Sequence, residues 1–194
     1  MKETSNGLFH HPGLRRFLVR MRAPIVIVGM IVVAQFVRSD WLLPGFAVSM
    51  CGEFIQLWCF ASLDKNSTLT ARGPYTMVRN PMYLGRFFIL FGFLMLLASG
   101  WILLAYTILY WLYMDARVQR EEAHLRPIFG AAYEHYCTTV WRFLPVWPAT
   151  GEPVGYWNWQ LFRRNNAGFN LAATLAAWAA VAAWALWGLP LLAG

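Results

Sequence analysis

Long apolar runs separated by short polar segments are the feature that most limits what this chain can fold into. One run covers residues 23–37, a second begins at Trp41 and reaches Leu63, and a last one covers 167–192. A helix needs about 20 apolar residues to cross the hydrocarbon core of a bilayer. Hydrophobic residues make up 59% of the chain and charged residues 13%, a composition unlike that of ordinary soluble domains. The pattern predicts an all-α membrane protein.

Two further apolar runs lie in the middle of the chain, at 83–99 and 101–114. Ser99-Gly100 leaves room only for a tight turn, which predicts an antiparallel helical hairpin of the third and fourth helices. The fourth helix is expected to continue over 115–125 and to end at Arg126-Pro127, the first helix-breaking signal. The predicted fold is therefore a polytopic helical bundle with about five transmembrane helices.

The whole chain, 1–194, is expected to form one membrane domain. A short helix with an aromatic face is predicted for Phe129–Tyr136, and the Trp- and Arg-rich residues 156–164 suit a membrane surface. The alanines between Ala172 and Ala185 are expected to allow close helix packing. In chain order, the expected parts are a cytoplasmic basic segment 1–22, two spans 23–63, a core 64–145, an interfacial segment 146–166 and a last span 167–193.

Basic residues predict the orientation of the chain. The net charge is +7, but Lys and Arg are scattered between apolar runs and form no dense stripe, which argues against nucleic-acid binding. Apart from Arg38 and Arg86, they all fall in the N-terminal segment, in 65–79 or in 115–164. The positive-inside rule places the N-terminus and both long polar segments in the cytoplasm and the C-terminus outside, in a bacterial-type inner membrane or its equivalent.

The polar segment Thr68–Gly85 carries turn and helix-start signals. Gly73-Pro74 indicates a turn. Asn80-Pro81 indicates a helix start, because Asn caps free backbone N–H groups and Pro fits the first helical position. Two tyrosines, Tyr75 and Tyr83, flank this cap, which a bare connector would not need. A basic cytoplasmic loop with a good helix cap is the alternative interpretation.

A second polar segment, 117–125, carries both acidic and basic side chains. On a continuous helix Arg117 and Glu121 share a face, and so do Glu121 and His124. The adjacent Glu121 and Glu122 point in different directions. One is therefore expected to pair with an arginine of the first polar segment, while the other faces a cationic ligand. A solvated, salt-bridged helix end is the alternative.

The predicted hairpin brings these two segments to the same depth on one membrane face, since the position opposite residue 81 is near residue 119. N–H groups at a helix start favour a carboxylate. A buried glutamate favours an ammonium or a sulfonium. Together they predict a site for a zwitterion, such as a cofactor derived from an amino acid.

One carboxylate, Glu53, lies inside the second span, with Gln56 on the same helix face. A charge at that depth is costly and needs a partner. Either Glu53 makes a structural hydrogen bond to a neighbouring helix, or it lines the substrate or cofactor cavity. The three cysteines show no metal-ligand spacing, so no metal site is expected.

Four motifs follow one another between residues 68 and 145. They are Gly73-Pro74-Tyr75-x-x-x-Arg79-Asn80-Pro81-Met82-Tyr83-x-Gly85, Arg117-x-x-x-Glu121-Glu122-x-x-Leu125, Phe129-Gly130-x-x-Tyr133-x-x-Tyr136 and Arg142-Phe143-x-Pro145. In this order they resemble the membrane methyltransferases typified by isoprenylcysteine carboxyl methyltransferase. Phospholipid N-methyltransferases share the pattern. Each piece is weak alone, but the ordered combination is specific.

The resemblance implies S-adenosyl-L-methionine as the methyl donor, bound at the cytoplasmic helix ends. By position, Glu121 matches a glutamate that holds the cofactor, and Arg117 matches an arginine linked to the substrate. The other expected cofactor contacts are Thr68, Leu69, Thr70, Ala71, Tyr75, Arg79, Asn80, Pro81, Met82 and Tyr83.

One position departs from the family pattern, because the usual Arg-His-Pro is Arg79-Asn80-Pro81 here. Asn does not titrate, so a mechanism that needs an imidazole base at this position is excluded. A carboxylate or thiolate acceptor, oriented by Arg117, needs no base. A phospholipid amine needs one, and Glu122, His124 and Glu53 are the candidates. This difference favours a prenylcysteine-like or other small apolar acceptor with a carboxylate or thiol over a phospholipid amine.

Two other function classes stay open. A membrane sterol-type reductase using NADPH has a similar helical arrangement, but additional spans and an obvious adenine-phosphate site are missing from this sequence. A non-enzymatic membrane scaffold would bind no cofactor. The expected partners are membrane lipids and a lipophilic or lipidated substrate, which would enter from the bilayer while the cofactor enters from the cytoplasm.

Overall fold

The computed structural model describes residues 34–64, 68–148 and 151–187. All regular structure within these residues is helical, as predicted. The basic segment 1–22 and residues 23–33 of the first predicted span lie outside the described residues. The elements, in chain order, are η2 (Ser39–Trp41), α2 (Leu42–Ser62), η3 (Gly73–Thr76), α3 (Pro81–Met95), α4 (Gly100–Thr139), α5 (Trp159–Arg164) and α6 (Ala167–Trp187).

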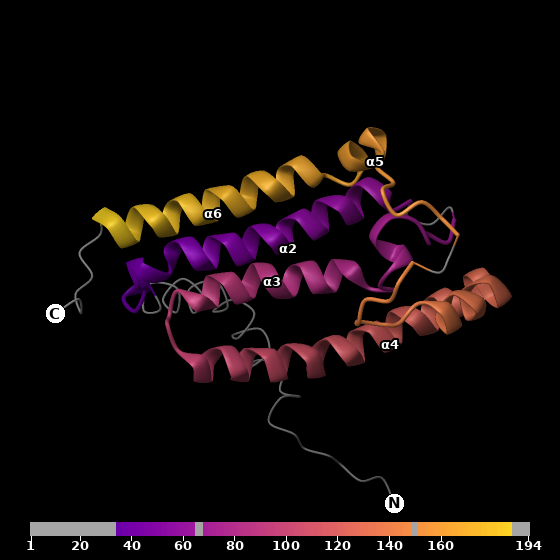
Figure 1. Cartoon of the computed structure of the whole chain (residues 1–194), viewed down its shortest axis with the longest axis horizontal. Helices are drawn as coiled ribbons and strands as arrows, with labels where there is room; N and C mark the ends of the chain where they lie inside the picture. Colours follow the sequence, from indigo (N-terminus) through magenta and orange to yellow (C-terminus); the bar gives the residue numbers. More distant parts are fainter. Residues whose placement is uncertain (1–33, 65–67, 149–150, 188–194) are drawn as a thin grey trace, which may run out of the picture.

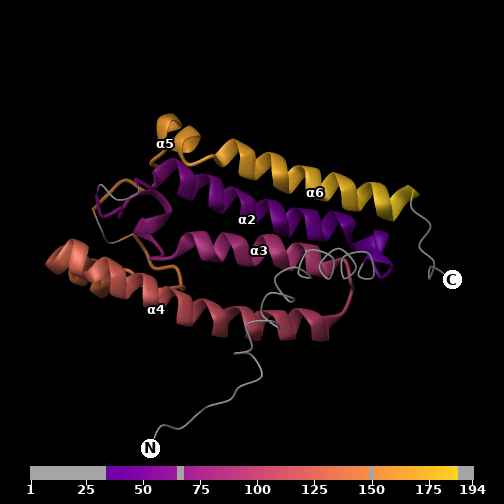
Figure 2. The same ribbon diagram turned by 180° about the vertical axis from the view of Figure 1, so that it is seen from behind.

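The long helices lie side by side in the order α6, α2, α3, α4 (Figures 1 and 2). Helices α2, α3 and α4 run in alternating directions, and α6 runs back along α2 (Figure 1). One end of this layer therefore collects the segment after α2, the distal half of α4, α5 and the start of α6. We call this end, made of the described residues of 64–80 and 115–166, the polar end. The two long polar segments of the sequence meet there.

Two of the described helices are long and apolar enough to cross a membrane: Ser39–Ser62, which joins η2 to α2, and α6. Only 11% of the apolar window of α6 is buried, which suits a helix that faces lipid rather than the core of a soluble protein. The third and fourth predicted spans do not meet the same test. Helix α3 has only 15 residues, and the apolar start of α4 continues into a polar half. The expectation of about five spans is therefore not confirmed.

Glycine residues allow α2 and α3 to approach each other closely. A Cβ atom added at Gly52 would lie 2.5 Å from the carbonyl oxygen of Gly85. About two turns earlier, a Cβ at Gly45 would lie 2.5 Å from the carbonyl oxygen of Gly92. Between these contacts, Ser49 donates a hydrogen bond of 2.8 Å to a backbone carbonyl of α3. Small residues promote helix association in membranes in this way.

Helix α6 packs less closely than its alanines predict. Its exposed residues include Ala172, Ala173, Ala176 and Ala177. The close helix packing expected there is found between α2 and α3 instead. Helix α6 is anchored by Trp178, whose ring stacks on Phe93 of α3 with 4.5 Å between the ring centroids.

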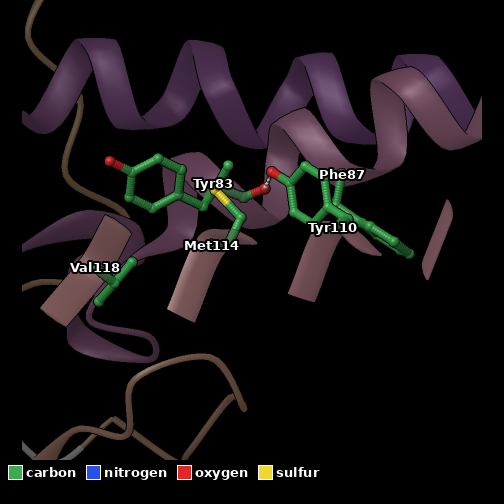
Figure 3. Close-up of a cluster of buried hydrophobic side chains, with 5 residues drawn as sticks. All are labelled: Tyr83, Phe87, Tyr110, Met114 and Val118. Carbon is green, nitrogen blue, oxygen red and sulfur yellow. Dashed lines mark hydrogen bonds between the residues drawn. The ribbon is translucent and has the colours of Figure 1, made fainter. Parts of the chain in front are cut away.

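Helices α3 and α4 are joined by residues 96–99, a longer connection than the predicted Ser99-Gly100 turn. Ala98 adopts a positive φ of 48° in it. The Tyr110 hydroxyl of α4 donates a hydrogen bond of 2.6 Å to the Tyr83 carbonyl oxygen at the start of α3. Figure 3 shows the buried cluster around this bond, formed by Tyr83, Phe87, Tyr110, Met114 and Val118. The cluster fixes the start of α3 against the middle of α4.

The prediction that the fourth helix ends at Arg126-Pro127 is wrong. Helix α4 continues through Pro127, and its backbone breaks at Gly130, where φ is 52° and ψ is −132°. Proline kinks a helix without necessarily ending it, whereas a positive φ is readily adopted only by glycine. Beyond the break the helix doubles back (Figure 1). Tyr133 and Tyr136 then pack against Phe129, so the predicted helix Phe129–Tyr136 is the folded-back end of α4.

The chain between α4 and α6 covers the end of α2. The Asn165 side-chain amide donates hydrogen bonds of 2.9 Å to the carbonyl oxygens of both Phe60 and Leu63. The segment that follows α2 adds a further contact, because its Arg72 guanidinium donates to the Ser62 carbonyl oxygen at 3.2 Å. The last carbonyl groups of a helix have no partner within the helix, so these contacts cap α2.

Candidate functional site

The polar end contains a cavity of about 880 Å³. Its walls are the end of α2, the segment 68–80, the first turns of α3 and the distal half of α4. Small-molecule sites typically have volumes of roughly 300–1,000 Å³. The charged residues that line this cavity are Asp64, Arg79, Arg86, Arg117, Arg120 and Glu121.

The Tyr83 hydroxyl joins two oppositely charged side chains at the cavity. It donates a hydrogen bond of 2.6 Å to Glu121 Oε2. It also accepts one of 3.1 Å from Nε of Arg117. The hydrogen bond to Tyr83 raises the pKa of the Arg117 guanidinium, so this side chain stays cationic. One residue of α3 thus holds an acidic and a basic side chain of α4, Glu121 and Arg117, side by side.

The segment 68–80 is supported from behind by buried side chains. The turn predicted at Gly73-Pro74 is present as η3, and Gly73 has a φ of 61° that favours glycine. The Tyr136 hydroxyl donates a hydrogen bond of 2.7 Å to the Tyr75 carbonyl oxygen. Burial raises the pKa of the Tyr75 phenol well above its usual value, so Tyr75 is a neutral, fixed part of the cavity wall.

The neighbouring glutamates of α4 have different surroundings, as their spacing predicts. Glu121 lines the cavity, whereas Glu122 is buried with 4% of its surface exposed. Glu122 accepts two hydrogen bonds from Arg142, and its Oε1 lies 3.6 Å from Nη2 of Arg79. The prediction that one glutamate pairs with an arginine of the first polar segment is confirmed by the Arg79 contact.

Most of the predicted cofactor contacts lie together. Those that line the cavity are Thr68, Leu69, Thr70, Tyr75, Arg79, Asn80, Met82, Tyr83 and Glu121, and the predicted substrate residue Arg117 joins them. Within the described part of the chain, Ala71, Pro81, Glu122 and Glu53 are not among the lining residues. Pro81 is fully buried at the start of α3, and Ala71 packs against the cluster that contains Tyr133.

The predicted cap by the Asn80 side chain is not present. No capping hydrogen bond from Asn80 to the described start of α3 is formed, although Asn80 occupies the N-cap position and Pro81 the first helical one. The Asn80 side-chain amide instead donates a hydrogen bond of 3.3 Å to the Arg142 carbonyl oxygen. The tertiary contact to the chain after α4 takes the place of the local cap.

Glu53 makes the structural hydrogen bonds that were one of its two predicted alternatives. Its carboxylate accepts from Nδ2 of Asn170 at 2.7 Å and from Oγ1 of Thr174 at 2.9 Å. Both donors belong to α6, and Glu53 itself is only 1% exposed. Glu53 therefore connects α2 to α6.

Several residues of the site were not predicted as such. Asp64 lines the cavity and forms an ion pair with Arg164 of α5. The two residues are 100 positions apart, so no local sequence pattern predicts this contact. Arg120 and Ile128, both from α4, also line the cavity. Tyr133 and Tyr136 also line the cavity. They belong to the motif that begins at Phe129, and their spacing in that motif was the sequence signal that could have identified them as site residues.

Comparisons with known proteins find methyltransferases that are similar to part of this chain. A family model described as phospholipid methyltransferase matches residues 41–132. The protein-S-isoprenylcysteine O-methyltransferase of Schizosaccharomyces pombe is 29% identical over 120 residues, which cover 62% of this chain and 48% of that protein. The Xenopus laevis protein of the same name is 35% identical over 78 residues, covering 40% of this chain and 27% of that protein.

A plant relative gives a similar match. The probable protein-S-isoprenylcysteine O-methyltransferase of Oryza sativa subsp. indica is 32% identical over 116 residues, which cover 60% of this chain and 58% of that protein. The chain thus spans between 27% and 58% of the length of these relatives. No solved structure matches it. The residues that build the Tyr83 contacts lie within the matched region, over which the chain is similar to isoprenylcysteine and phospholipid methyltransferases.

Proposed function

We propose that this chain is an S-adenosylmethionine-dependent membrane methyltransferase that acts on a lipophilic acceptor with a carboxylate or thiol group. The observation that carries the proposal is the pair of hydrogen bonds at Tyr83, which hold Glu121 and Arg117 side by side at the cavity. A transferase of this kind must bring a cationic donor and an anionic acceptor together, and this pair offers one complementary charge to each.

The residues of the cavity fit the methyl donor. The Glu121 carboxylate attracts the cationic groups of S-adenosylmethionine, while Arg79 attracts its carboxylate. The buried rings of Tyr75, Tyr133 and Tyr136 give a flat, apolar wall for an adenine ring. When bound, S-adenosylmethionine would supply an electrophilic methyl group on sulfur. The protein's own contribution is then to align the two reactants and to exclude water.

Arg117 is the residue proposed to orient the acceptor. It is held by the Tyr83 hydroxyl, and two further cations, Arg86 and Arg120, line the same cavity. An acceptor that is already an anion needs no base. Opposite charges are neutralised during its methylation, so a partly dry cavity favours the reaction. This route agrees with Asn80, which does not titrate, and with Glu122, which is engaged by two arginines.

Methylation of a phospholipid amine is the second candidate function. It is favoured by His124, which lines the cavity one turn of α4 away from Glu121 and has the chemistry of a general base. Incubating membranes with methyl-labelled S-adenosylmethionine, followed by separate extraction of lipids and proteins, separates the two candidates. Label on a phospholipid amine, lost in His124→Ala, would support the second candidate over the first.

We also propose that the polar end faces the cytoplasm and that the C-terminus lies outside. The arginines of 72–79 and 117–164 belong to this end, while the amide of Arg38 donates a hydrogen bond to the Leu96 carbonyl oxygen at the opposite end of α3. The donor then enters from the cytoplasm, and the acceptor enters from the bilayer between helices. Donor binding from only the outer side of oriented vesicles would overturn this orientation.

The experiment that tests the main proposal uses the purified chain in detergent. S-Adenosylhomocysteine is expected to raise its melting temperature, whereas NADPH is not. Glu121→Ala is expected to abolish this shift. Glu134→Ala removes an exposed glutamate of α4 that pairs with Arg126, and it is expected to keep the shift. Stabilisation by NADPH would instead favour a reductase, and no response to either ligand would favour a scaffold.

A further inference from the structure

Arg142 connects both walls of the cavity from outside it. It follows α4, beyond residue 132, where the family match ends. Its Nε and Nη2 atoms donate hydrogen bonds of 3.1 and 2.8 Å to the two oxygens of Glu122. Its Nη1 atom donates one of 2.8 Å to Asp115, about two turns earlier on the same face of α4. A single guanidinium thus forms hydrogen bonds to two residues of α4, Asp115 and Glu122.

The other wall is attached at the same place. The Arg142 carbonyl oxygen accepts a hydrogen bond from the Asn80 side chain at 3.3 Å. The Arg79 amide donates one of 2.9 Å to the carbonyl oxygen of Trp141. Both Arg79 and Asn80 line the cavity. The chain around Arg142 therefore fixes the spacing between the segment 68–80 and α4.

The pairing of Glu122 with Arg142 fixes the rotation of α4 about its own axis. It is 4% exposed, and a buried carboxylate that loses its partners is strongly unfavourable. A bidentate arginine–carboxylate pair also restricts the angle at which the two side chains meet. Adjacent residues of a helix differ by about 100° in direction. Holding Glu122 against Arg142 therefore determines where Glu121 points.

We propose that Arg142 is a positioning residue: through Glu122 it sets the rotation of α4, so that Glu121 faces the segment 68–80 across the cavity. The effect of Arg142 on donor affinity rests on the proposed function. Its effect on the distance between the two walls does not.

A distance measurement tests the geometric part. Spin labels at Thr68 and Ala123, which are exposed on opposite walls, are measured by pulsed electron paramagnetic resonance, with Cys51 and Cys137 replaced by serine. Arg142→Gln is expected to broaden and shift the distance distribution. Arg142→Lys keeps the charge but loses the bidentate hydrogen bonds. Its distance distribution is expected to lie between those of the unmodified chain and Arg142→Gln.

The matched control is Arg126→Gln. It breaks an exposed arginine–glutamate pair of 3.2 Å on the same helix, between Arg126 and Glu134. We expect it to leave the distance distribution unchanged, because exposed ion pairs constrain little. An effect of Arg126→Gln equal to that of Arg142→Gln would overturn the proposal.

Binding of S-adenosylhomocysteine to the full chain tests the functional part. Arg142→Gln and Glu122→Gln are each expected to weaken binding on the order of tenfold, the lower end of the losses seen for residues that orient metal ligands. Both substitutions break the same Arg142–Glu122 interaction. The double variant is therefore expected to bind no worse than either single variant. Unchanged affinity and an unchanged distance distribution in Arg142→Gln would overturn the proposal.

Failure of the proposed function is recognised separately. If the unmodified chain binds no S-adenosylhomocysteine, the proposed function is wrong, and the distance measurement alone decides the role of Arg142. If Arg142→Gln does not fold, Arg142→Lys and Asp115→Asn decide by the same distance measurement. A distribution unchanged in both would contradict the proposal.

Discussion

The α2–α3 interface and the polar end are held together by different interactions. Helices α2 and α3 meet through glycines, whose missing Cβ atoms let the backbones touch. The polar end is held by directional contacts, such as the fork of Arg142 on Glu122 and the Tyr83 hydroxyl between Glu121 and Arg117. Packing of small residues is sensitive to volume, whereas hydrogen-bonded charges are sensitive to chemistry. Stability is therefore expected to depend mainly on the first region and ligand binding on the second.

The largest effect is expected from added volume between α2 and α3. In Gly52→Val, the new Cβ atom would lie 2.5 Å from the Gly85 carbonyl oxygen, so the helices must move apart. We expect a loss of about 3 kcal/mol in the free energy of unfolding, the upper part of the range for overpacking. Thermal unfolding in detergent measures it.

The control for this change is Gly168→Ala in α6. A Cβ atom there meets nothing within 4 Å among the described residues, so stability should be unchanged or slightly higher. Equal melting temperatures of Gly52→Val and the unmodified chain would mean that the α2–α3 contact does not hold the fold.

The next effect is expected at Glu53, a carboxylate of α2 that lies outside the polar end and bonds to α6. Asn170→Ala removes its 2.7 Å hydrogen bond. An unsatisfied buried acceptor costs about 1–3 kcal/mol, so the melting temperature should fall. The affinity for S-adenosylhomocysteine should stay the same, since Glu53 lies outside the described lining of the cavity. A variant that melts normally but binds weakly would reverse the assignment of the two regions.

A smaller and purely functional effect is expected at Tyr83. Tyr83→Phe removes the hydroxyl that joins Glu121 to Arg117. One hydrogen bond is worth about 1 kcal/mol, or roughly fivefold in affinity, and isothermal titration with S-adenosylhomocysteine measures it. Tyr106→Phe is the matched control, because it removes a hydroxyl that donates 3.2 Å to the Phe87 carbonyl oxygen at the same helix interface. Equal affinities in the two variants would remove Tyr83 from the site.

The buried phenol of Tyr75, at the polar end, is expected to have the smallest effect, because it changes the stability of the fold only at high pH. Burial raises the pKa of Tyr75 well above its usual value of 10. Above about pH 10, Tyr75 therefore loses its proton in the unfolded chain but keeps it in the folded one, and stability falls as pH rises. The expected slope is about 1.4 kcal/mol per pH unit. Because the unfolded phenol is only partly ionised near its pKa, Tyr75→Phe should reduce the loss of stability between pH 10 and 11 by about 1 kcal/mol. An unchanged profile would contradict the burial of this phenol.

Sequence reasoning succeeded where a contact depends on local spacing. The runs that became α2 and α6 are visible as apolar stretches, and the opposite directions of Glu121 and Glu122 follow from one helical step. It failed where a distant partner changes a local preference. Asn80 bonds to the Arg142 carbonyl oxygen rather than capping α3, because the chain after α4 passes beside it. That approach depends on the break at Gly130, which returns the chain towards the cavity. No spacing rule places these residues together, so Arg142 was recognised only as part of a motif.

The proposed function requires that the carboxylate of Glu121, at the polar end, holds the methyl donor. Isothermal titration of S-adenosylhomocysteine into Glu121→Gln and Glu53→Gln tests it most directly, because each variant neutralises one carboxylate without changing its size. Glutamine at position 53 can still bond to both Asn170 and Thr174, so that variant should fold and bind like the unmodified chain. We predict that binding is lost in Glu121→Gln and kept in Glu53→Gln. Full binding in Glu121→Gln, or loss in Glu53→Gln alone, would contradict the account.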